Sequence, residues 1–397
     1  MRQESVSTRR SGDSSLLRRL NVSAALGAFL ATESLTLREL RSAIGVSRPT
    51  AEEVLADLVA QQRIEEAPPH DRERRAGRPA RRFRLRASSG YVLGADIGAH
   101  KVMVAVTDLR GNVLALRRRR VEPQQSARSR LGVVRAVIQS ALTTAGLDAS
   151  DLDGAAAGVV GALRIDSEVL DVQRANMGAD LHPYSLPEFG DVDVADELAE
   201  HLGRPVLVAN DVKVAALAER WQGAAQDADD IVYMFAGQRL GAGVLIGGQV
   251  HQGRHGAAGE VGTLPLLGWE SAMQHLEAVA TRLAPSGDTD IERVFAAATD
   301  GSQRAIRVVD EIARALALGA ATLVASVDPE LVVLGGGMSR AGALIAEPFT
   351  RHLTAMCLFE PHVVISTMGD ESVALGAVRL ALDDVQRQLL DVDGPTN

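Results

Sequence analysis

A pattern that occurs twice, about 140 residues apart, restricts the fold of this chain more than any other feature. In each copy an apolar strand runs into a glycine, a return strand follows, and a hairpin turn follows that. The first copy covers residues 92–121 and the second covers residues 231–248. Between them, residues 128–145 have helical spacing and residues 155–160 are typical of a buried strand. Strands that alternate with helices predict an α/β fold, with two similar lobes facing each other across a cleft.

The charge of the chain divides near residue 90. Residues 1–90 contain 17 Arg, no Lys and 11 acidic residues, a net charge of +6, whereas the remainder has a net charge of −15. A basic head on an acidic body indicates that only the head contacts a polyanion such as DNA. The whole chain has two lysines, Lys101 and Lys213, and we attribute this bias toward arginine to genome composition.

Length and composition exclude several classes of protein. The 397 residues suffice for two or three domains of roughly 150 residues each. No apolar run approaches the ~20 residues of a membrane span, and no signal-peptide pattern follows the N-terminus. We therefore expect a cytoplasmic protein, associated with the nucleoid, without a membrane partner. Cys357 is the only cysteine, which excludes an internal disulfide and a multi-cysteine zinc site.

The head begins with signals for two helices. Residues 1–14 are polar and are expected to form a disordered tail. Residues 16–30 place apolar side chains on one face of a helix. Thr36 and Glu39 have the spacing of a capping box, which opens a second, short helix that ends at Gly45.

A third helix follows, with Ser47 as its N-cap and Pro49 in its first turn. Two helices joined by a short turn with glycine predict a helix-turn-helix, whose second helix reads bases with its first residues. The apolar face of this helix carries Ala51, Val54, Leu55, Leu58 and Val59. The residues expected at DNA are Ser47, Arg48, Thr50 and Ala51. The alternative is a plain three-helix bundle.

Two polar–apolar alternations, at residues 63–66 and 82–86, predict strands on either side of a long basic loop. Strands and loop together are typical of the wing of a winged helix-turn-helix, which would span residues 15–88. Gly-Arg-Pro in the loop can lie extended in a narrow minor groove, which assigns Arg78 to DNA. The arginines around Gly77 and Pro79 are Arg74, Arg75, Arg78, Arg81 and Arg82. The alternative is a solvated basic face.

The segments LLRRLN, LRELRSAIGVSRPTAEEVLADLVAQQRI and AGRPARRFRL resemble the winged helix of the ROK family (repressor, open reading frame, kinase). The resemblance extends over residues 16–385. It implies a ribonuclease-H-like body of the two-lobed sugar-kinase and actin type at residues 89–397. The lobe boundary is expected near residue 210, with a C-terminal helix that returns to the first lobe.

The resemblance also implies a sugar site. In ROK kinases the Asp of an Asn-Asp pair is the general base, and here that residue is Asp211; from the local sequence alone Asp211 reads as the N-cap of a helix that starts near Val212. Carboxylates and amides can grip neighbouring sugar hydroxyls, and buried ones discriminate most strongly. The alternative for each residue alone is ordinary surface polarity. The expected sugar-binding set is Asn176, Asn210, Asp211, Glu260 and Glu277.

The nucleotide and zinc sites of the family are altered. Ala99-His100 stands where the family has Gly-Thr, and Gln238-Arg239 adds bulk to the second phosphate loop, which counts against ATP. The remaining glycines fit ordinary tight turns better than nucleotide binding; they are Gly98, Gly237, Gly335 and Gly336. Thr263 replaces the zinc-binding histidine and the cysteine cluster is absent, so we expect no metal and no cofactor.

These observations favour a sugar-responsive transcriptional repressor without efficient kinase activity, working as a homodimer or higher oligomer on an inverted repeat of operator DNA. The first alternative is an active ATP-dependent sugar kinase with a DNA-binding head, which Asp96 and Asp211 support. The second is a regulator that has lost its sugar ligands and responds to a protein partner.

Overall fold

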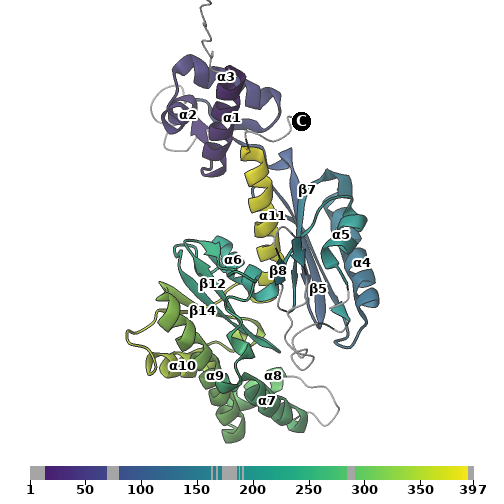
Figure 1. The fold of residues 1–397 in the computed structure, drawn as a ribbon, viewed down its shortest axis with the longest axis vertical. Helices are drawn as coiled ribbons and strands as arrows, with labels where there is room; N and C mark the ends of the chain where they lie inside the picture. Colours follow the sequence, from purple (N-terminus) through teal and green to yellow (C-terminus); the bar gives the residue numbers. More distant parts are fainter. Residues whose placement is uncertain are drawn as a thin grey trace, which may run out of the picture. The chain divides into compact units, whose positions relative to one another are not determined.

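A computed structural model describes most of the chain, in two compact units (Figure 1). The head unit is Met1–Tyr91 with Thr107–Asn112 and Leu382–Asn397, and the body unit is Val92–Val106 with Val113–Ala381. Of the expected tail, only Ser14 is described, as the first residue of a helix. The described residues are 14–68, 80–161, 164–166, 169–171, 186, 188–189, 192–283 and 291–391.

The head unit contains a winged helix-turn-helix, as expected. Its sheet has the strand order β1-β3-β2, and both pairings are antiparallel. The short strand β1 was not expected, because two residues give no periodicity. The elements are α1 (Ser14–Leu30), β1 (Leu35–Thr36), α2 (Leu37–Ile44), α3 (Arg48–Ala60), β2 (Ile64–Ala67) and β3 (Arg82–Leu85).

Local signals define both helices of the helix-turn-helix. The Thr36 hydroxyl accepts the Glu39 N–H at 3.2 Å, and the Glu39 carboxylate accepts the Thr36 N–H at 2.8 Å, so the capping box is confirmed. Helix α2 ends at Gly45, which has φ of 68°, the left-handed conformation that glycine favours. The Ser47 side chain accepts the Thr50 N–H, which confirms Ser47 as the cap of α3.

The first lobe of the body unit is a five-stranded sheet in the order β10-β7-β4-β5-β6. Helices α4 and α5 lie on one side of this sheet in Figure 1, and α11 lies on the other. The strands are β4 (Tyr91–Ile97), β5 (Lys101–Asp108), β6 (Val113–Arg120), β7 (Leu152–Val159) and β10 (Leu207–Asn210). The helices are α4 (Ala127–Ala145), α5 (Val194–Leu202) and α11 (Ser372–Leu390). A separate two-stranded ribbon consists of β8 (Arg164–Asp166) and β9 (Val169–Asp171).

The second lobe repeats that topology in the order β13-β12-β11-β14-β15, so the expected duplication and the α/β class are confirmed. Helix α6 packs on one face of this sheet, and the core between the sheet and α7–α10 fills the other. The strands are β11 (Ile231–Ala236), β12 (Leu240–Ile246), β13 (Gln249–Val250), β14 (Leu331–Gly335) and β15 (Val363–Ile365). The helices are α6 (Asp211–Gln222), α7 (Trp269–Leu283), α8 (Ile291–Thr299), α9 (Gln303–Val327) and α10 (Ala343–Thr354).

Three glycines allow α11 to pack closely against the first sheet and α6. A Cβ on Gly94 of β4 would lie 2.3 Å from the Ala374 carbonyl oxygen, and a Cβ on Gly158 of β7 would lie 2.6 Å from Val373 Cγ1. A Cβ on Gly376 would lie 1.7 Å from the carbonyl oxygen of Val214 in α6. Only glycine fits at these positions, so the first turns of α11 lie directly against β4, β7 and α6. Among the described residues, no helix is long and apolar enough to cross a membrane.

Candidate functional site

The start of α6 holds the first two candidate residues, and they have different roles. The Asn210 side chain is buried; its Oδ1 accepts the Lys213 N–H at 3.1 Å, and its Nδ2 donates to the Gly161 carbonyl at 2.9 Å. Asn210 is therefore the N-cap of α6. Asp211 is the first residue of the helix, which corrects the local reading of Asp211 as the cap. The carboxylate of Asp211 is left for other contacts.

Asp211 has the electrostatics of a proton-exchanging group. Burial is the main cause that raises the pKa of Asp211 to about 7; the nearby Asp96 and Glu260 carboxylates contribute to this rise, and the Val212 N–H and Arg239 oppose it. Its Oδ1 accepts the Val212 N–H at 2.9 Å. Near neutral pH the carboxyl group is divided between its protonated and ionised forms, so it can both donate a hydrogen bond to a hydroxyl and accept one.

Glu260 lies close to Asp211, and it also interacts electrostatically with a lysine that the sequence did not single out. Lys213 is 3% exposed, and its ammonium donates to the Gly256 carbonyl. Burial raises the pKa of Glu260, and the charge of Lys213 opposes that shift. Burial likewise lowers the pKa of Lys213. A lysine among the apolar residues of the first turns of this helix, in a chain with two lysines, was the signal available for it.

The other two expected sugar-binding residues are not brought to this group. Glu277 is exposed on α7, and its backbone carbonyl accepts the Thr281 hydroxyl at 2.9 Å. In the described part of the chain no contact joins Glu277 to Asp211 or Glu260. Asn176 lies outside the described residues. The structure therefore gathers Asn210, Asp211 and Glu260, and adds Asp96 and Lys213.

The first glycine loop is fixed by an arginine that the sequence did not reveal. Arg130 of α4 is completely buried, and its guanidinium donates to the carbonyls of Gly98 at 2.7 Å and Ala99 at 3.0 Å. The Gly98 N–H itself donates to the Lys101 carbonyl at 3.0 Å. His100, which follows in the loop, hydrogen-bonds to Gln238, and burial lowers the pKa of His100. The two loops expected to hold phosphates are thus joined to each other.

The four glycines considered for nucleotide binding make hydrogen bonds or close packing contacts with other residues of the chain. The Gly237 N–H donates to the Arg239 carbonyl at 3.2 Å, so neither this N–H nor that of Gly98 is available to a phosphate. A Cβ on Gly335 would lie 2.2 Å from the Tyr233 hydroxyl. Gly336 has φ of 85°, and a Cβ there would lie 2.6 Å from the Ala236 carbonyl oxygen. These contacts give each of the four glycines a structural role within the chain.

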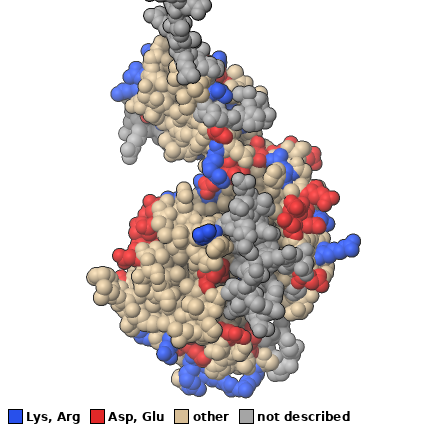
Figure 2. Space-filling view, viewed as in Figure 1, with Lys and Arg blue, Asp and Glu red and all other residues tan. Residues whose placement is uncertain are grey.

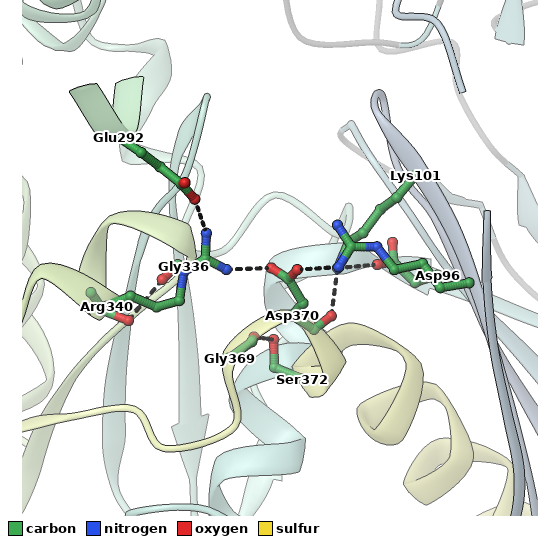
Figure 3. Close-up of polar contacts among 10 residues, drawn as sticks. Asp96, Lys101, Glu292, Gly336, Arg340, Gly369, Asp370 and Ser372 are labelled. Carbon is green, nitrogen blue, oxygen red and sulfur yellow. Dashed lines mark hydrogen bonds and ion pairs between the residues drawn. The ribbon is translucent and has the colours of Figure 1, made fainter. Parts of the chain in front are cut away.

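A polar network that includes Asp96 links the two lobes (Figure 3). The Asp370 carboxylate accepts from Arg118 of β6 at 2.7 Å and from Arg340 of the second lobe at 3.1 Å. Lys101 donates to the Asp370 backbone carbonyl and lies 3.1 Å from an Asp96 carboxylate oxygen. Burial alone would raise the pKa of Asp370, but the three cations hold it below its ordinary value. Arg340 also pairs with a further carboxylate, Glu292 of α8, at 2.6 Å.

The residues at the family's zinc position do not fit a metal ion. The Thr263 hydroxyl donates to the Glu260 carbonyl at 2.7 Å, and Leu266 nearby is 87% exposed. No cluster of His, Cys, Asp and Glu suited to a metal occurs among the residues that the structure describes. Zinc binding usually needs four such ligands around one point.

In the head unit, the start of α3 presents part of the expected DNA-reading set. The Arg48 side chain is 72% exposed and pairs with Glu52 at 2.9 Å. Ser47 is exposed and Thr50 is half-buried; their hydroxyls lie 2.8 Å apart. Ala51 is completely buried. The expectation that Ala51 contacts DNA is therefore corrected: it packs in the core of the head.

Of the five arginines expected around Gly77 and Pro79, Arg81 and Arg82 are described, and they differ from each other. Arg81 is exposed, pairs with Glu66 at 2.7 Å and lies over the Phe83 ring at 5.3 Å. Arg82 is 6% exposed, and its guanidinium donates to the side chain and carbonyl of Ser34 and pairs with Glu39. Arg82 therefore supports the capping box and does not belong to a DNA-facing cluster. Arg74, Arg75 and Arg78 lie outside the described residues.

Acidic and basic side chains are unevenly distributed on the surface of the body unit. Acidic side chains gather around α5 in Figure 2, and the sequence of this helix includes Asp196 and Glu197 in its first turn. Such a surface repels DNA, which agrees with the net charge of −15 for residues 91–397.

Comparison with known proteins identifies relatives of two kinds. The ROK family model matches residues 92–272 and 270–384. A putative xylose repressor of a Caldicellulosiruptor species is 22% identical over 406 residues, which cover 94% of this chain and 98% of the relative. A glucokinase from Halalkalibacterium halodurans is 30% identical over 261 residues, which cover 57% of this chain and 75% of the glucokinase. The repressor thus matches head and body together.

Solved structures show the same division. A ROK family transcriptional regulator, described as a homologue of the E. coli MLC protein, matches with a TM-score of 0.70 and 20% identity over 96% of this chain and 100% of its own. A ROK glucokinase from Streptomyces griseus, in complex with glucose and AMPPNP, matches with a TM-score of 0.60 and 23% identity over 74% of this chain and 100% of its own. At these identities the likeness establishes the fold.

Proposed function

Because this chain belongs to the ROK family, we propose that it is a sugar-responsive transcriptional repressor. The observation that carries the proposal is the match to xylose repressors over 94% of the chain, which includes the winged helix-turn-helix. In this proposal the head, residues 15–88, follows a tail of residues 1–14 and binds operator DNA. The body, residues 89–397, binds the sugar. The protein acts in the cytoplasm, on DNA of the nucleoid.

We place the expected sugar cleft at the start of α6, where the residues have the groups that a sugar needs. Asp211 can donate and accept a hydrogen bond, because its pKa is about 7. Glu260 provides a carboxylate whose ionised form is favoured by the charge of Lys213. The Asn210 amide nitrogen uses one hydrogen for the Gly161 carbonyl, and its second hydrogen can be donated to a ligand. A buried polar set of this kind selects ligands with hydroxyls at matching positions, since a missing partner leaves a buried group unpaired. Asn176 and Glu277 remain proposed as further sugar contacts.

A second candidate function is ATP-dependent phosphorylation of the sugar, and one observation favours it. Asp211 has a pKa suited to a general base and lies near Asp96, which also has a raised pKa because of its burial. Against it stand the occupied N–H groups of Gly98 and Gly237 and the Gln238–His100 hydrogen bond. Phosphoryl transfer depends on positioning of the phosphates, so a base alone does not sustain it. We propose that the protein lacks efficient kinase activity.

The experiment that tests the repressor proposal begins with selection of duplexes from a random-sequence pool by the full-length protein. The dissociation constant of the selected duplex is then measured with and without xylose, glucose and N-acetylglucosamine. We expect one of these sugars to change DNA affinity by about 5-fold or more, the lower end of common allosteric couplings. Failure to select any sequence would contradict the assignment as a DNA-binding regulator.

The same sugars decide between repressor and kinase when they are assayed with ATP in a coupled assay. Turnover on the order of 1–100 per second would favour the kinase. The variant Asp211→Ala is expected to abolish the sugar response while effector-free DNA binding stays unchanged, because Asp211 lies in the body unit. A sugar response that survives Asp211→Ala would place the effector outside this cleft and would favour a protein partner or another ligand site.

A further inference from the structure

Helix α11 touches α6 three residues after Asp211, and the contact is between backbones. A Cβ on Gly376 would lie 1.7 Å from the Val214 carbonyl oxygen and 2.4 Å from its carbonyl carbon. A Cβ on Gly158 would lie 2.9 Å from Val214 Cγ2, so Val214 is also confined from the side of β7. With no side chain between the two helices, a shift of α6 cannot be absorbed by a change of rotamer. It must displace α11 as well.

The start of α11 is tied to both lobes. Asp370 lies in the turn Gly369–Glu371, directly before α11, and accepts from Arg118 of the first lobe and Arg340 of the second (Figure 3). Lys101 donates to the backbone carbonyl of the same residue. A change in the separation of the lobes therefore has to stretch or break the ion pairs at the residue that leads into α11.

The end of α11 belongs to the head unit, which includes the chain from Leu382 onward. The Ser23 hydroxyl of α1 donates to the Leu390 carbonyl at 2.7 Å. A Cβ on Gly27, one turn later in α1, would lie 3.6 Å from Leu390 Cδ2, an ordinary packing distance. The last turn of α11 is thus bonded to the first helix of the winged helix-turn-helix.

We propose that α11 couples the sugar cleft to the DNA-binding head. This proposal rests on the proposed function and adds the path by which sugar binding would reach the head. Sugar binding at Asp211 moves the first turn of α6, the Val214 backbone moves α11 at Gly376, and α11 carries the change to α1 at Ser23. The ion pairs of Asp370 with Arg118 and Arg340 hold the start of α11 in place before the sugar binds. A helix can transmit such a displacement along its axis as one rigid element, and packed interfaces of this kind switch between discrete arrangements.

The first test compares two helical glycines. In Gly376→Ala the new methyl group forces α6 and α11 apart, whereas in Gly132→Ala of α4 it meets nothing within 4 Å. The measured quantity is the ratio of DNA dissociation constants at saturating and zero sugar, with the sugar and the duplex identified above. Saturation removes any change in sugar affinity from this ratio. We expect Gly376→Ala to bring the ratio to within about twofold of one, and Gly132→Ala to keep the wild-type ratio, commonly 5- to 150-fold.

A second pair of variants covers the case in which Gly376→Ala does not fold. Asp370→Asn keeps the size of the side chain and removes the charge that Arg118 and Arg340 share. Glu371→Gln makes the same kind of change at an exposed residue of the same turn. We expect Asp370→Asn to lower the ratio of DNA dissociation constants by at least about threefold, a change that the usual size of allosteric couplings makes measurable. Glu371→Gln should leave this ratio unchanged. As a control, the thermal stabilisation of each variant by the sugar is measured, which shows whether that variant still binds the sugar.

Wild-type ratios in both Gly376→Ala and Asp370→Asn, with sugar binding retained, would overturn the coupling role of α11 and leave the repressor proposal standing. Wild-type protein whose DNA affinity no sugar changes would instead overturn the proposed function itself.

Discussion

Asn210 and Asp211 show how far two adjacent residues can differ in function. Both types are preferred N-caps, with nearly equal propensity, so the local sequence could not say which of them caps α6. The structure assigns the cap to Asn210 and leaves the carboxyl of Asp211 among other carboxylates. The sequence predicted the pair. It could not predict which residue caps α6 and which has the raised pKa, because these roles depend on Gly161, Asp96 and Glu260, all distant in the chain.

The raised pKa of Asp211 predicts a pH-dependent stability. In the unfolded chain an aspartate ionises near pH 4, whereas folded Asp211 holds its proton up to about pH 7. The folded state therefore binds more protons between these values, and the free energy of unfolding falls as pH rises through this window. Asp211→Asn removes the effect. We expect the variant to gain stability relative to wild type from pH 4 to 7, by roughly 4 kcal/mol at most.

Urea unfolding at several pH values measures this difference, with Asp300→Asn at an exposed position of the same chain as the control. Parallel stability curves for Asp211→Asn and wild type would show that Asp211 ionises at its ordinary pH.

Two neighbouring arginines of β3 provide a second prediction. Arg82 is buried against Ser34 and Glu39, so Arg82→Ala removes hydrogen bonds that support the capping box of α2; we expect a loss of about 1–3 kcal/mol. Arg81 forms an exposed ion pair with Glu66, and Arg81→Ala should cost less than about 1 kcal/mol. Hydrogen exchange of the α2 amides in the full-length protein reports the local stability. Equal exchange rates in the two variants would contradict the role of Arg82.

At the scale of elements, the structure agrees best with the sequence where the signal is local. Helices α2 and α3 were predicted with their caps, because capping boxes and left-handed glycines involve residues three or four apart. The packing of α11 on α6 was not predicted, since Gly376 and Val214 are far apart in sequence. The same holds for Arg130, whose burial and bonds to the Gly98 and Ala99 carbonyls depend on residues about 30 positions away.

The wing loop yields a prediction for DNA binding. Arg78 lies between β2 and β3, outside the described residues, and we expect it to enter the minor groove. Arg78→Ala should weaken binding of the selected duplex several-fold and reduce the slope of log affinity against log salt by about one. Filter binding across a salt titration measures both quantities, with the exposed, paired Arg81→Ala as the matched control. An unchanged salt slope in Arg78→Ala would exclude the wing from the interface.

At the scale of the whole molecule, the duplicated sheets could be predicted because the hairpins repeat in sequence order. The parallel strands β7, β10, β14 and β15 complete both sheets in the same order. Which carboxylates meet at the start of α6 could be predicted in part. Asp211 and Glu260 followed from the family pattern, whereas Lys213 and the Asp370 network did not, because long-range ion pairs have no local periodicity.

One helix-turn-helix makes few base contacts, and this predicts the form of the operator. At the start of α3, Arg48 is the exposed side chain of the expected DNA-reading set that is long enough to reach a base edge. A symmetric dimer doubles these contacts on two half-sites, one or two helical turns apart. We expect footprinting to show an inverted repeat, and sedimentation to show a dimer or higher oligomer. Protection of a single unrepeated half-site by a monomer would contradict this arrangement.

The distribution of lysine has a practical consequence. Lys101 pairs with Asp96 and binds the Asp370 carbonyl, and Lys213 lies beside Glu260, so both lysine ammonium groups of the chain belong to the cleft and its network. Reagents that acylate amines usually modify a protein all over its surface. In this chain their side-chain targets are confined to one functional region, with 20% exposure at Lys101 and 3% at Lys213. Mass spectrometry of acylated protein would therefore record the opening and closing of the cleft at two residues, against an arginine-rich surface that does not react.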